Sequence, residues 1–308
     1  MRLASFAYGG RQRCGVVAGD VVRPFATDAD LRAVIAGGPG TPALEDGVPL
    51  AHVRLRPPLV PASLRDFVTF EEHVRGVRRS IDGVGGVPEA WYDAPTFYFS
   101  NPHTIHGPDD DIRFPAASVA RDFELEVAAV IGPDGAIFGY TILNDWSARD
   151  LQSREMQVGL GPAKGKDFAG SLGPWIVTAD ELEPYRDSDG FLDLWCTASV
   201  NGAEVGRDLL SNMGWTFETL AAYAARDSRL IAGDVLGSGT VGNGGCLAEL
   251  WGRNGRQDPP PLRDGDVVTL AVQGIGSLTN RVTSAAPGPA LPVVRRRSPE
   301  LSRKDLDV

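Results

Sequence analysis

The chain has 308 residues, of which 43% are hydrophobic and 23% charged, and its formal net charge at pH 7 is −10. This composition is typical of a globular protein with a large core, and the acidic balance argues against nucleic acid and anionic membrane surfaces as partners. We expect no signal peptide and no membrane-spanning run, and three widely spaced cysteines indicate a reducing cytoplasm.

Residues 1–58 predict a small β-rich domain. Its short apolar runs are separated by turn residues and predict strands at 3–8, 13–18 and 20–24. Residues 28–36 then predict a helix. A Pro-rich stretch at 55–61 predicts a linker. We therefore expect a larger catalytic domain over 62–285 and a flexible tail over 286–308.

Asp66 and His73 stand seven residues apart near the start of the larger domain. A helix over this segment would place both on one face, because seven residues make two helical turns. The residues alone leave two interpretations, a helix-capping aspartate with a surface histidine or a pair of site residues. His103 and His106 have no third histidine nearby and are interpreted as loop residues.

Three carboxylates, Glu124, Glu126 and Asp145, follow in the most informative stretch. Residues 123–131 are apolar or β-branched and predict a strand, and residues 137–143 predict the returning strand before Asp145. Alternate strand residues share a face, so Glu124 and Glu126 point the same way. The three carboxylates could hold one hard divalent cation. The alternative is a solvated strand face followed by a capping aspartate.

Basic and polar residues follow these carboxylates. Arg149 and Gln152 are three residues apart and share a face if a helix begins at Asp145. Lys166 follows in a glycine-rich loop. Cationic and amide groups beside a carboxylate-bound metal suit a substrate that itself carries a carboxylate.

The rest of the chain predicts more strands than helices. Asn201-Gly202 is a strong hairpin-turn signal. Residues 212–226 predict an amphipathic helix. Thr240 follows a strand predicted at 230–236 and lies among glycines. Many short strands with few helices indicate a β-rich α+β fold.

Six motifs follow one another along this chain: Arg121-Asp122-Phe123-Glu124-Leu125-Glu126, Asn144-Asp145-Trp146-Ser147-Ala148-Arg149-Asp150-Leu151-Gln152, Gly161-Pro162-Ala163-Lys164-Gly165-Lys166, Ser171-Leu172-Gly173-Pro174-Trp175, Asn201-Gly202 and Gly237-Ser238-Gly239-Thr240. Together they resemble the fumarylacetoacetate hydrolase family over about residues 63–282. The resemblance implies a mixed β-roll with a small N-terminal domain, usually paired into a homodimer. It also implies Mg²⁺ or Mn²⁺ as cofactor, with Ca²⁺ as an alternative.

The resemblance assigns roles to individual residues. It implies four metal ligands, which are Asp66, Glu124, Glu126 and Asp145. His73 would be the general base, with Glu249 as its supporting carboxylate, although Glu249 could instead be an exposed strand residue. Lys166 would stabilise an enolate. Three residues would bind the substrate carboxylate: Arg149, Gln152 and Thr240.

Three positions depart from the family pattern. Gly76 stands where the acylpyruvase-like branch has a lid glutamate, so the fumarylacetoacetase-like arrangement fits better. Met156 stands where the fumarylacetoacetase pattern has a substrate-contacting tyrosine. Gly170 matches a threonine, and Ser171 beside it could substitute. These departures argue against fumarylacetoacetate itself as the substrate.

The resulting hypothesis is a cytoplasmic, metal-dependent hydrolase that cleaves a C–C bond in a small anionic β-diketo or 2-oxo acid. The alternative within enzymes is a hydratase, decarboxylase or tautomerase of a 2-oxo acid that uses the same metal site. The alternative outside enzymes is a non-catalytic metabolite-binding protein. Intact carboxylates together with Lys166 argue for an enzyme, because a binding module would not need all of them.

Overall fold

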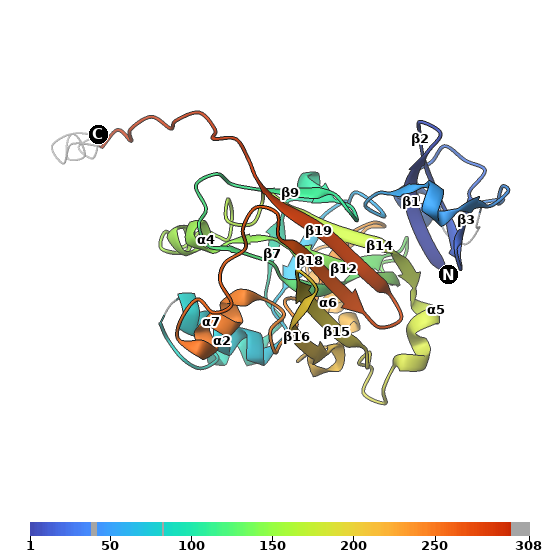
Figure 1. Cartoon of the computed structure of the whole chain (residues 1–308). Coiled ribbons are helices and arrows are strands. Elements are labelled where there is room, and N and C mark those ends of the chain that lie inside the picture. Colours follow the sequence, from blue (N-terminus) through green and yellow to red (C-terminus); the bar gives the residue numbers. More distant parts are fainter. Residues whose placement is uncertain (38–41, 82, 297–308) are drawn as a thin grey trace, which may run out of the picture.

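The computed structural model describes residues 1–37, 42–81 and 83–296. Two mixed sheets and a few short helices make up this part of the chain (Figure 1). The β-rich α+β fold predicted from the sequence is therefore confirmed. The predicted tail lies partly outside the described residues. Residues 286–296 are exposed, have no regular structure and run away from the body of the protein (Figure 1).

The larger sheet has 12 strands in the order β4-β3-β2-β1-β14-β12-β11-β17-β6-β7, and β5 and β8 pair with β1 and β14. These strands are β1 (Arg2–Tyr8), β2 (Arg11–Ala18), β3 (Val21–Pro24), β4 (Val48–Pro49), β5 (Arg54–Leu55), β6 (Leu64–Phe67), β7 (Phe97–Ser100), β8 (Ile105–His106), β11 (Leu125–Ile131), β12 (Ile137–Asp145), β14 (Gly170–Thr178) and β17 (Val235–Gly237). The N-terminal strands continue this sheet, because Arg2 of β1 pairs with Val177 of β14.

The second sheet has five strands in the order β16-β15-β18-β19-β9. They are β9 (Asp111–Phe114), β15 (Trp195–Val200), β16 (Ala203–Leu209), β18 (Val267–Val272) and β19 (Gly276–Ser284), and a separate two-stranded ladder joins β10 (Arg121–Asp122) to β13 (Ser147–Ala148). The α-helices are α1 (Leu31–Ala36), α2 (Glu71–Ile81), α3 (Glu89–Asp93), α4 (Arg149–Met156), α5 (Ala179–Leu182), α6 (Phe217–Ala225) and α7 (Leu247–Asn254).

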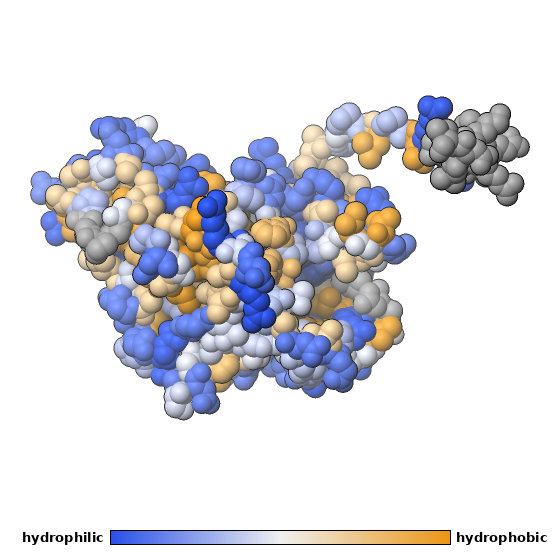
Figure 2. Space-filling view, turned by 180° about the vertical axis from the view of Figure 1, so that it is seen from behind, coloured by the Kyte–Doolittle hydropathy of each residue, from blue (hydrophilic) through white to orange (hydrophobic). Residues whose placement is uncertain are grey.

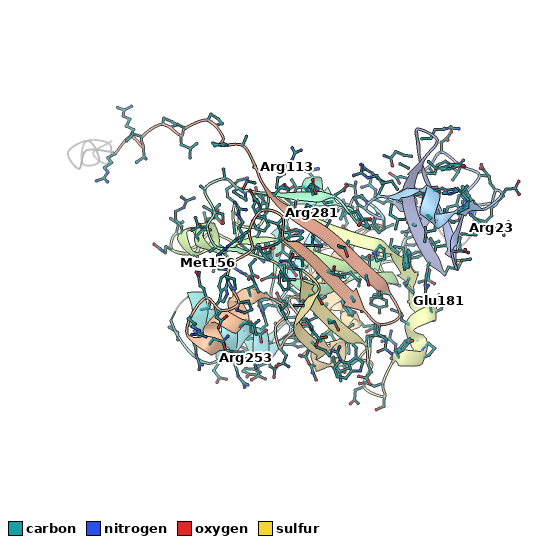
Figure 3. All side chains as sticks on the ribbon, viewed as in Figure 1. Arg23, Arg113, Met156, Glu181, Arg253 and Arg281 are labelled. Atoms are coloured by element: carbon teal, nitrogen blue, oxygen red, sulfur yellow. The ribbon has the colours of Figure 1, made fainter. Side chains whose placement is uncertain are left out.

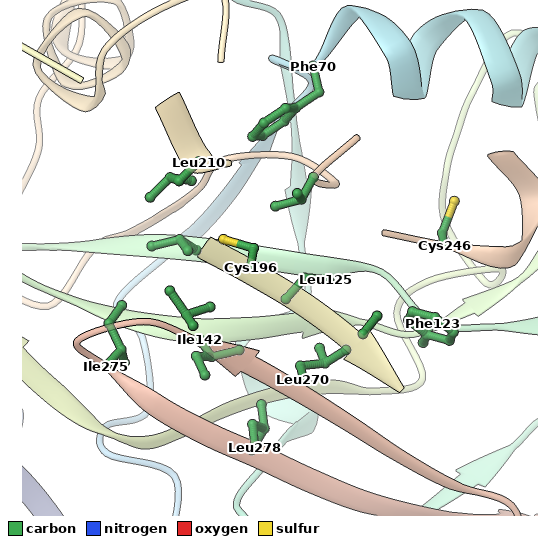
Figure 4. Packing of buried hydrophobic residues seen from close by; sticks show 14 of the residues in the cluster. Phe70, Phe123, Leu125, Ile142, Cys196, Leu210, Cys246, Leu270, Ile275 and Leu278 are labelled. Atoms are coloured by element: carbon green, nitrogen blue, oxygen red, sulfur yellow. The ribbon is translucent and has the colours of Figure 1, made fainter. Parts of the chain in front are cut away.

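The main hydrophobic core lies between the two sheets. Leu125 and Ile142 of the larger sheet contribute to the same buried cluster as Cys196, Leu270 and Leu278 of the smaller sheet (Figure 4). Every residue of β11 is buried, because one side of the strand faces this cluster and the other faces a second apolar cluster beneath the N-terminal strands. A strand buried on both faces reads as a continuous apolar run, which explains why this segment stands out in the sequence.

The structure differs from four expectations about secondary structure. The returning strand continues to Asp145, so the helix expected to begin there begins only at Arg149. Asp66 lies on β6 and His73 on α2, so no single helix carries both. The helix expected over residues 212–226 is α6, whose N-terminus is capped by Thr216. Glu249 lies on helix α7 and is fully buried, so its interpretation as an exposed strand residue is wrong.

One face of the molecule is mostly polar. On the face shown in Figure 2, hydrophilic residues cover most of the area and hydrophobic residues form smaller patches. None of the helices in the described part of the chain is both long and apolar enough to cross a membrane.

Helices α2 and α7 cross at two glycines. A Cβ at Gly252 would lie 1.9 Å from the carbonyl oxygen of Gly76, and a Cβ at Gly76 would lie 2.4 Å from Cγ of Glu249. Neither position can hold a side chain without moving the helices apart. The absence of a lid glutamate at position 76 therefore has a steric reason, since α7 occupies the space that its side chain would need.

The crossing gives a direct stability prediction. Gly252→Ala forces a main-chain shift, so we expect it to lower the free energy of unfolding by about 1 to 3 kcal/mol, as overpacking of a close contact generally does. Urea denaturation measures the change. Gly85→Ala is the matched control, because its Cβ would meet nothing closer than 3.8 Å. Equal stabilities of the two variants would contradict this account of the crossing.

Candidate active site

Neighbouring strands of the larger sheet deliver the predicted carboxylates to one place. The order β12-β11-β17-β6 sets Asp145, the β11 glutamates and Asp66 on or beside adjacent strands. Gly237 of β17 lies between them and pairs with Asp66 in register. A Cβ at Gly237 would lie 2.7 Å from both Oδ1 of Asp66 and Oε2 of Glu126. The glycine therefore leaves the space in which the carboxylates meet.

The four carboxylates form one buried cluster. Asp66, Glu124, Glu126 and Asp145 each offer an oxygen, and these oxygens all lie within 4.8 Å of one another. Each residue is at most 4% exposed. The structure thus brings together the complete ligand set that the sequence predicts.

Lys166 and Tyr98 bind to this cluster. The ammonium of Lys166 donates to Oδ2 of Asp145 at 2.6 Å and to Glu124. The hydroxyl of Tyr98, on β7, donates to the same Asp145 oxygen at 2.5 Å. Burial alone would lower the pKa of Lys166, but Asp145 and Glu124 outweigh it and raise that pKa. Lys166 is therefore a fixed positive charge at the cluster.

Two carboxylate oxygens in the cluster have no hydrogen-bond partner, Oδ1 of Asp66 and Oε1 of Glu126. A buried carboxylate oxygen without a partner is costly, unless a cation or proton compensates it. Carboxylate oxygens are among the ligands that Mg²⁺ and Mn²⁺ prefer. The residues present therefore fit a divalent metal ion, as the sequence predicted.

The pKa is raised for three of the four carboxylates and lowered for one. Burial first and neighbouring carboxylates second raise the pKa of Asp66 and of Glu126 well above their usual range. Burial also raises the pKa of Asp145, although Lys166 opposes the shift. For Glu124 the cations Lys166 and Arg149 outweigh burial and lower the pKa. Glu124 is thus compensated within the protein, whereas Asp66 and Glu126 are not.

Arg149 is buried and its guanidinium is engaged by protein groups. Its Nη2 lies 2.7 Å from Asp122 and 2.7 Å from Glu124, and its Nη1 donates to Oε1 of Gln152 at 3.1 Å. Arg149 and Gln152 are thus neighbours on α4, as predicted. Binding of a substrate carboxylate by these two residues stays a prediction.

His73 lies beside the cluster on α2, buried and neutral at pH 7. Burial lowers its pKa to about 4, and the charges that act on it are those of Glu124, Arg149 and Lys166. Its Nδ1 is 3.6 Å from the sulfur of Cys246. A neutral imidazole retains a free nitrogen lone pair and can accept a proton.

Glu249, the expected support of His73, has hydrogen-bond partners of its own. Oε1 of Glu249 accepts from the backbone of Gly244 at 3.2 Å and from Arg253 at 3.3 Å. Arg253 lies on the outer side of α7 (Figure 3). Burial raises the pKa of Glu249 to about 7. Among the hydrogen bonds of the described residues, none joins Glu249 to His73.

Three further positions were singled out in the sequence: Thr240, Gly170 and Met156. Thr240 is buried in the loop after β17, and within the described residues its hydroxyl makes no hydrogen bond to the cluster. Gly170 pairs in register with Asp145, with the side chain of Ile105 next to it. Met156 ends α4 and is half-exposed (Figure 3).

Three residues of the site were not predicted: Tyr98, Asp122 and Cys246. Asp122 stands two positions before Glu124, so the every-second-residue spacing along this stretch was a usable signal. Tyr98 and Cys246 reach the site only through strand and helix packing, and no local pattern marks them.

Comparisons with known proteins match this site and fold. Residues 63–283 match the family model described as fumarylacetoacetate (FAA) hydrolase C-terminal, and residues 1–58 match one described as Rv2993c-like, N-terminal. The fumarylacetoacetase of Arabidopsis thaliana is 30% identical over 310 residues, covering 77% of this chain and 73% of that protein.

Two solved structures extend the comparison. One is a fumarylacetoacetate hydrolase from Exiguobacterium antarcticum, with a TM-score of 0.72, 27% identity, and coverage of 92% of this chain and 100% of that one. The other is a 5-carboxymethyl-2-hydroxymuconate delta-isomerase from Mycobacterium smegmatis, with a TM-score of 0.69, 28% identity, and the same coverage. Similar chains thus carry both hydrolase and isomerase names.

The raised pKa values predict how stability depends on pH. Folding raises the pKa of Asp66 and Glu126, so the stability of the metal-free protein falls as pH rises through these raised values. At pH 8 we expect Glu126→Gln to raise the Tm of the metal-free protein, by about 2 to 4 °C for each kcal/mol of repulsion removed. Mn²⁺ should raise the Tm of the parent protein and leave this variant nearly unchanged.

The matched control is Glu204→Gln, which neutralises an exposed glutamate paired with Arg207. It should leave both the metal-free Tm and the Mn²⁺ response as they are. Differential scanning calorimetry at pH 6 and pH 8 measures both quantities. A Glu126→Gln protein that melts below its parent without metal would contradict the predicted repulsion.

Proposed function

This chain belongs to the fumarylacetoacetate hydrolase family, and from that membership we propose that it is a divalent-metal-dependent enzyme that hydrolyses a C–C bond in a small 2-oxo or β-diketo acid. One observation carries the proposal. Four buried carboxylates, two of them with unpartnered oxygens, lie beside an ammonium and a neutral imidazole.

Asp66, Glu124, Glu126 and Asp145 would hold Mg²⁺ or Mn²⁺, with Ca²⁺ as the less favoured alternative. When bound, such an ion polarises the oxygens of a 1,3-dicarbonyl or 2-oxo acid and offsets the negative charge that develops there. The proposed substrate is therefore a small anion that carries such oxygens.

Lys166 would stabilise the enolate of the departing fragment. Its ammonium is buried, permanently charged and held by two carboxylates. A fixed positive charge in a water-poor site stabilises developing negative charge strongly, because it needs no reorganisation during the reaction. Tyr98 shares the Asp145 oxygen with Lys166 and so helps to orient that carboxylate.

His73 would act as the general base. Its pKa of about 4 keeps it neutral at physiological pH, so it can take a proton from a water that attacks the ketone carbon. The proton then passes to the carbon of the departing enolate, which leaves as a ketone, and the water oxygen stays in the acid product. Support of His73 by Glu249 stays a prediction from the resemblance, and the thiol of Cys246 is the neighbour that lies next to Nδ1.

The substrate carboxylate would be bound at the α4 side of the cluster. Gln152, Thr240 and the guanidinium of Arg149 are the proposed contacts of the substrate carboxylate. Arg149 also orients Glu124, because its Nη2 lies 2.7 Å from that carboxylate. We further propose that the enzyme is cytoplasmic, as its widely spaced cysteines indicate, and that it is a homodimer, as the family resemblance implies.

The second candidate is a hydratase, decarboxylase or tautomerase of a 2-oxo acid. The relative named as a delta-isomerase favours it, and the same carboxylates and Lys166 would serve an enolate without hydrolytic water. The non-enzymatic alternative is a metabolite-binding protein, which would bind a metal ion and a 2-oxo acid without converting the acid.

A product assay separates these candidates. The metal-loaded protein is incubated with acylpyruvates, fumarylacetoacetate and oxaloacetate in ¹⁸O-labelled water, and enol absorbance and product masses are recorded. We expect loss of the enol band and two fragments, with one ¹⁸O in the new carboxylic acid. Carbon dioxide or an isomer of unchanged composition would instead support the second candidate. Metal and substrate binding without any product would support a binding protein.

His73 provides a more specific prediction. His73→Gln should lower kcat for hydrolysis by about 10² to 10⁴, the range by which a positioned general base typically accelerates a reaction. His103→Gln, a change of an exposed histidine in the short 3-10 helix Pro102–Thr104, is the matched control and should be close to the parent. If His73→Gln kept most of the rate, hydrolysis through this base would be excluded.

A further inference from the structure

The proposed function uses four carboxylates, but a fifth is buried directly behind them. Asp122 ends β10 and is fully buried. Its Oδ1 accepts from the backbone N–H groups of Phe123 and Leu247, both at 2.8 Å. Its Oδ2 accepts from the backbone of Ala248 at 3.0 Å and from Nε of Arg149 at 2.8 Å. Both oxygens of Asp122 are therefore fully used within the protein.

The contact with Arg149 connects Asp122 to the carboxylate cluster. Arg149 forms an ion pair with each of two carboxylates, since its Nη2 lies 2.7 Å from Oδ2 of Asp122 and 2.7 Å from Oε1 of Glu124, although Nη2 makes no hydrogen bond of regular geometry to either. The other oxygen of Glu124 accepts from Lys166. Arginine has a rigid planar fork, so the position of Asp122 determines where the guanidinium can hold Glu124.

The contacts with the backbone of α7 connect Asp122 to His73, the proposed base. Leu247 and Ala248 are the first two residues of α7, and Asp122 accepts from the free N–H groups of both. A carboxylate at this end also interacts favourably with the helix dipole. Cys246 is the N-cap of the same helix, and its sulfur lies 3.6 Å from Nδ1 of His73. Asp122 thereby determines where the neighbour of His73 lies.

We propose that Asp122 is a positioning residue that holds the metal ligand Glu124 and the base His73 in one fixed relation to each other. It acts on Glu124 through Arg149, and on His73 through the N-terminus of α7 and Cys246. Asp122 itself reaches neither the metal nor the substrate. The role of His73 in this inference rests on the proposed function, whereas the contacts of Asp122 do not.

We expect two variants to differ in Mn²⁺ affinity and in the NMR signals of His73. Both are prepared free of metal and studied without substrate. Asp122→Asn keeps the shape of the side chain but removes its charge and one acceptor oxygen. We expect it to weaken Mn²⁺ binding about tenfold in calorimetric titration, as loss of an outer contact to a metal ligand commonly does. It should also shift the imidazole signals of His73 in ¹H–¹⁵N NMR spectra, in which only four histidines contribute.

Cys246→Ala separates the two connections. It should shift the His73 signals but keep the Mn²⁺ dissociation constant within about twofold of the parent, because Arg149 and Glu124 stay in place. His73→Gln identifies which NMR signals belong to His73. Asp110→Asn is the matched control, since Asp110 also binds an arginine, Arg54, and a backbone N–H, that of Gly107, but away from the cluster. It should change neither quantity.

An Asp122→Asn protein that is folded, binds Mn²⁺ like the parent and leaves the His73 signals in place would overturn the inference. If that variant does not fold, Arg149→Lys tests the metal connection and Cys246→Ala the histidine connection. Unchanged Mn²⁺ affinity in the first, or unchanged His73 signals in the second, would then be the contradicting result. Because no substrate is used, a wrong proposal about the reaction would leave these outcomes unaffected.

Discussion

The candidate active site is built around four buried carboxylates whose negative charge the protein's own cations only partly neutralise. Four carboxylates meet within 4.8 Å in a buried space. Ionised groups this close repel each other strongly when water is excluded, and their pKa values rise unless a cation compensates them. Lys166 compensates Glu124 and Asp145, but Asp66 and Glu126 keep unpartnered oxygens. The metal-free cluster is therefore destabilising, because its charges repel each other. A divalent cation would neutralise them and bind the unpartnered oxygens.

The surrounding architecture keeps these groups in place despite their repulsion. Strands buried on both faces carry the carboxylates, so side-chain movement costs core packing. Gly237 provides the space between them, and the crossing of α2 and α7 at Gly76 and Gly252 places His73 next to the cluster. Such a site is built at the expense of stability, which is common where a function requires a strained or charged environment.

Much of this arrangement could be predicted from the sequence, and the reasons are local. Alternation along the segment from Glu124 to Ile131 predicted a strand with both glutamates on one face, and the apolar run marked the centre of the sheet. Asp145 followed from the end of the returning strand. The family resemblance added Asp66 and His73, which belong to different elements, so no spacing rule within one helix or strand could place them at the site.

What could not be predicted depends on packing between distant segments. The hydrogen bonds of Glu249 could not be predicted, because the packing of α7 directs its carboxylate to Gly244 and Arg253. The engagement of Arg149 by Asp122 is equally invisible in the sequence, because a cation near carboxylates can face a substrate or a neighbouring side chain. Tyr98 reaches Asp145 although three strands, β11, β17 and β6, separate β7 from β12 in the sheet.

A crystal of the protein soaked in MnCl₂, with anomalous diffraction recorded near the manganese absorption edge, tests the central claim most directly. The account predicts one strong anomalous peak per chain, within bonding distance of oxygens of Asp66, Glu124, Glu126 and Asp145. A peak bound by other residues, or a cluster that stays free of manganese while its carboxylates keep these positions, would contradict it.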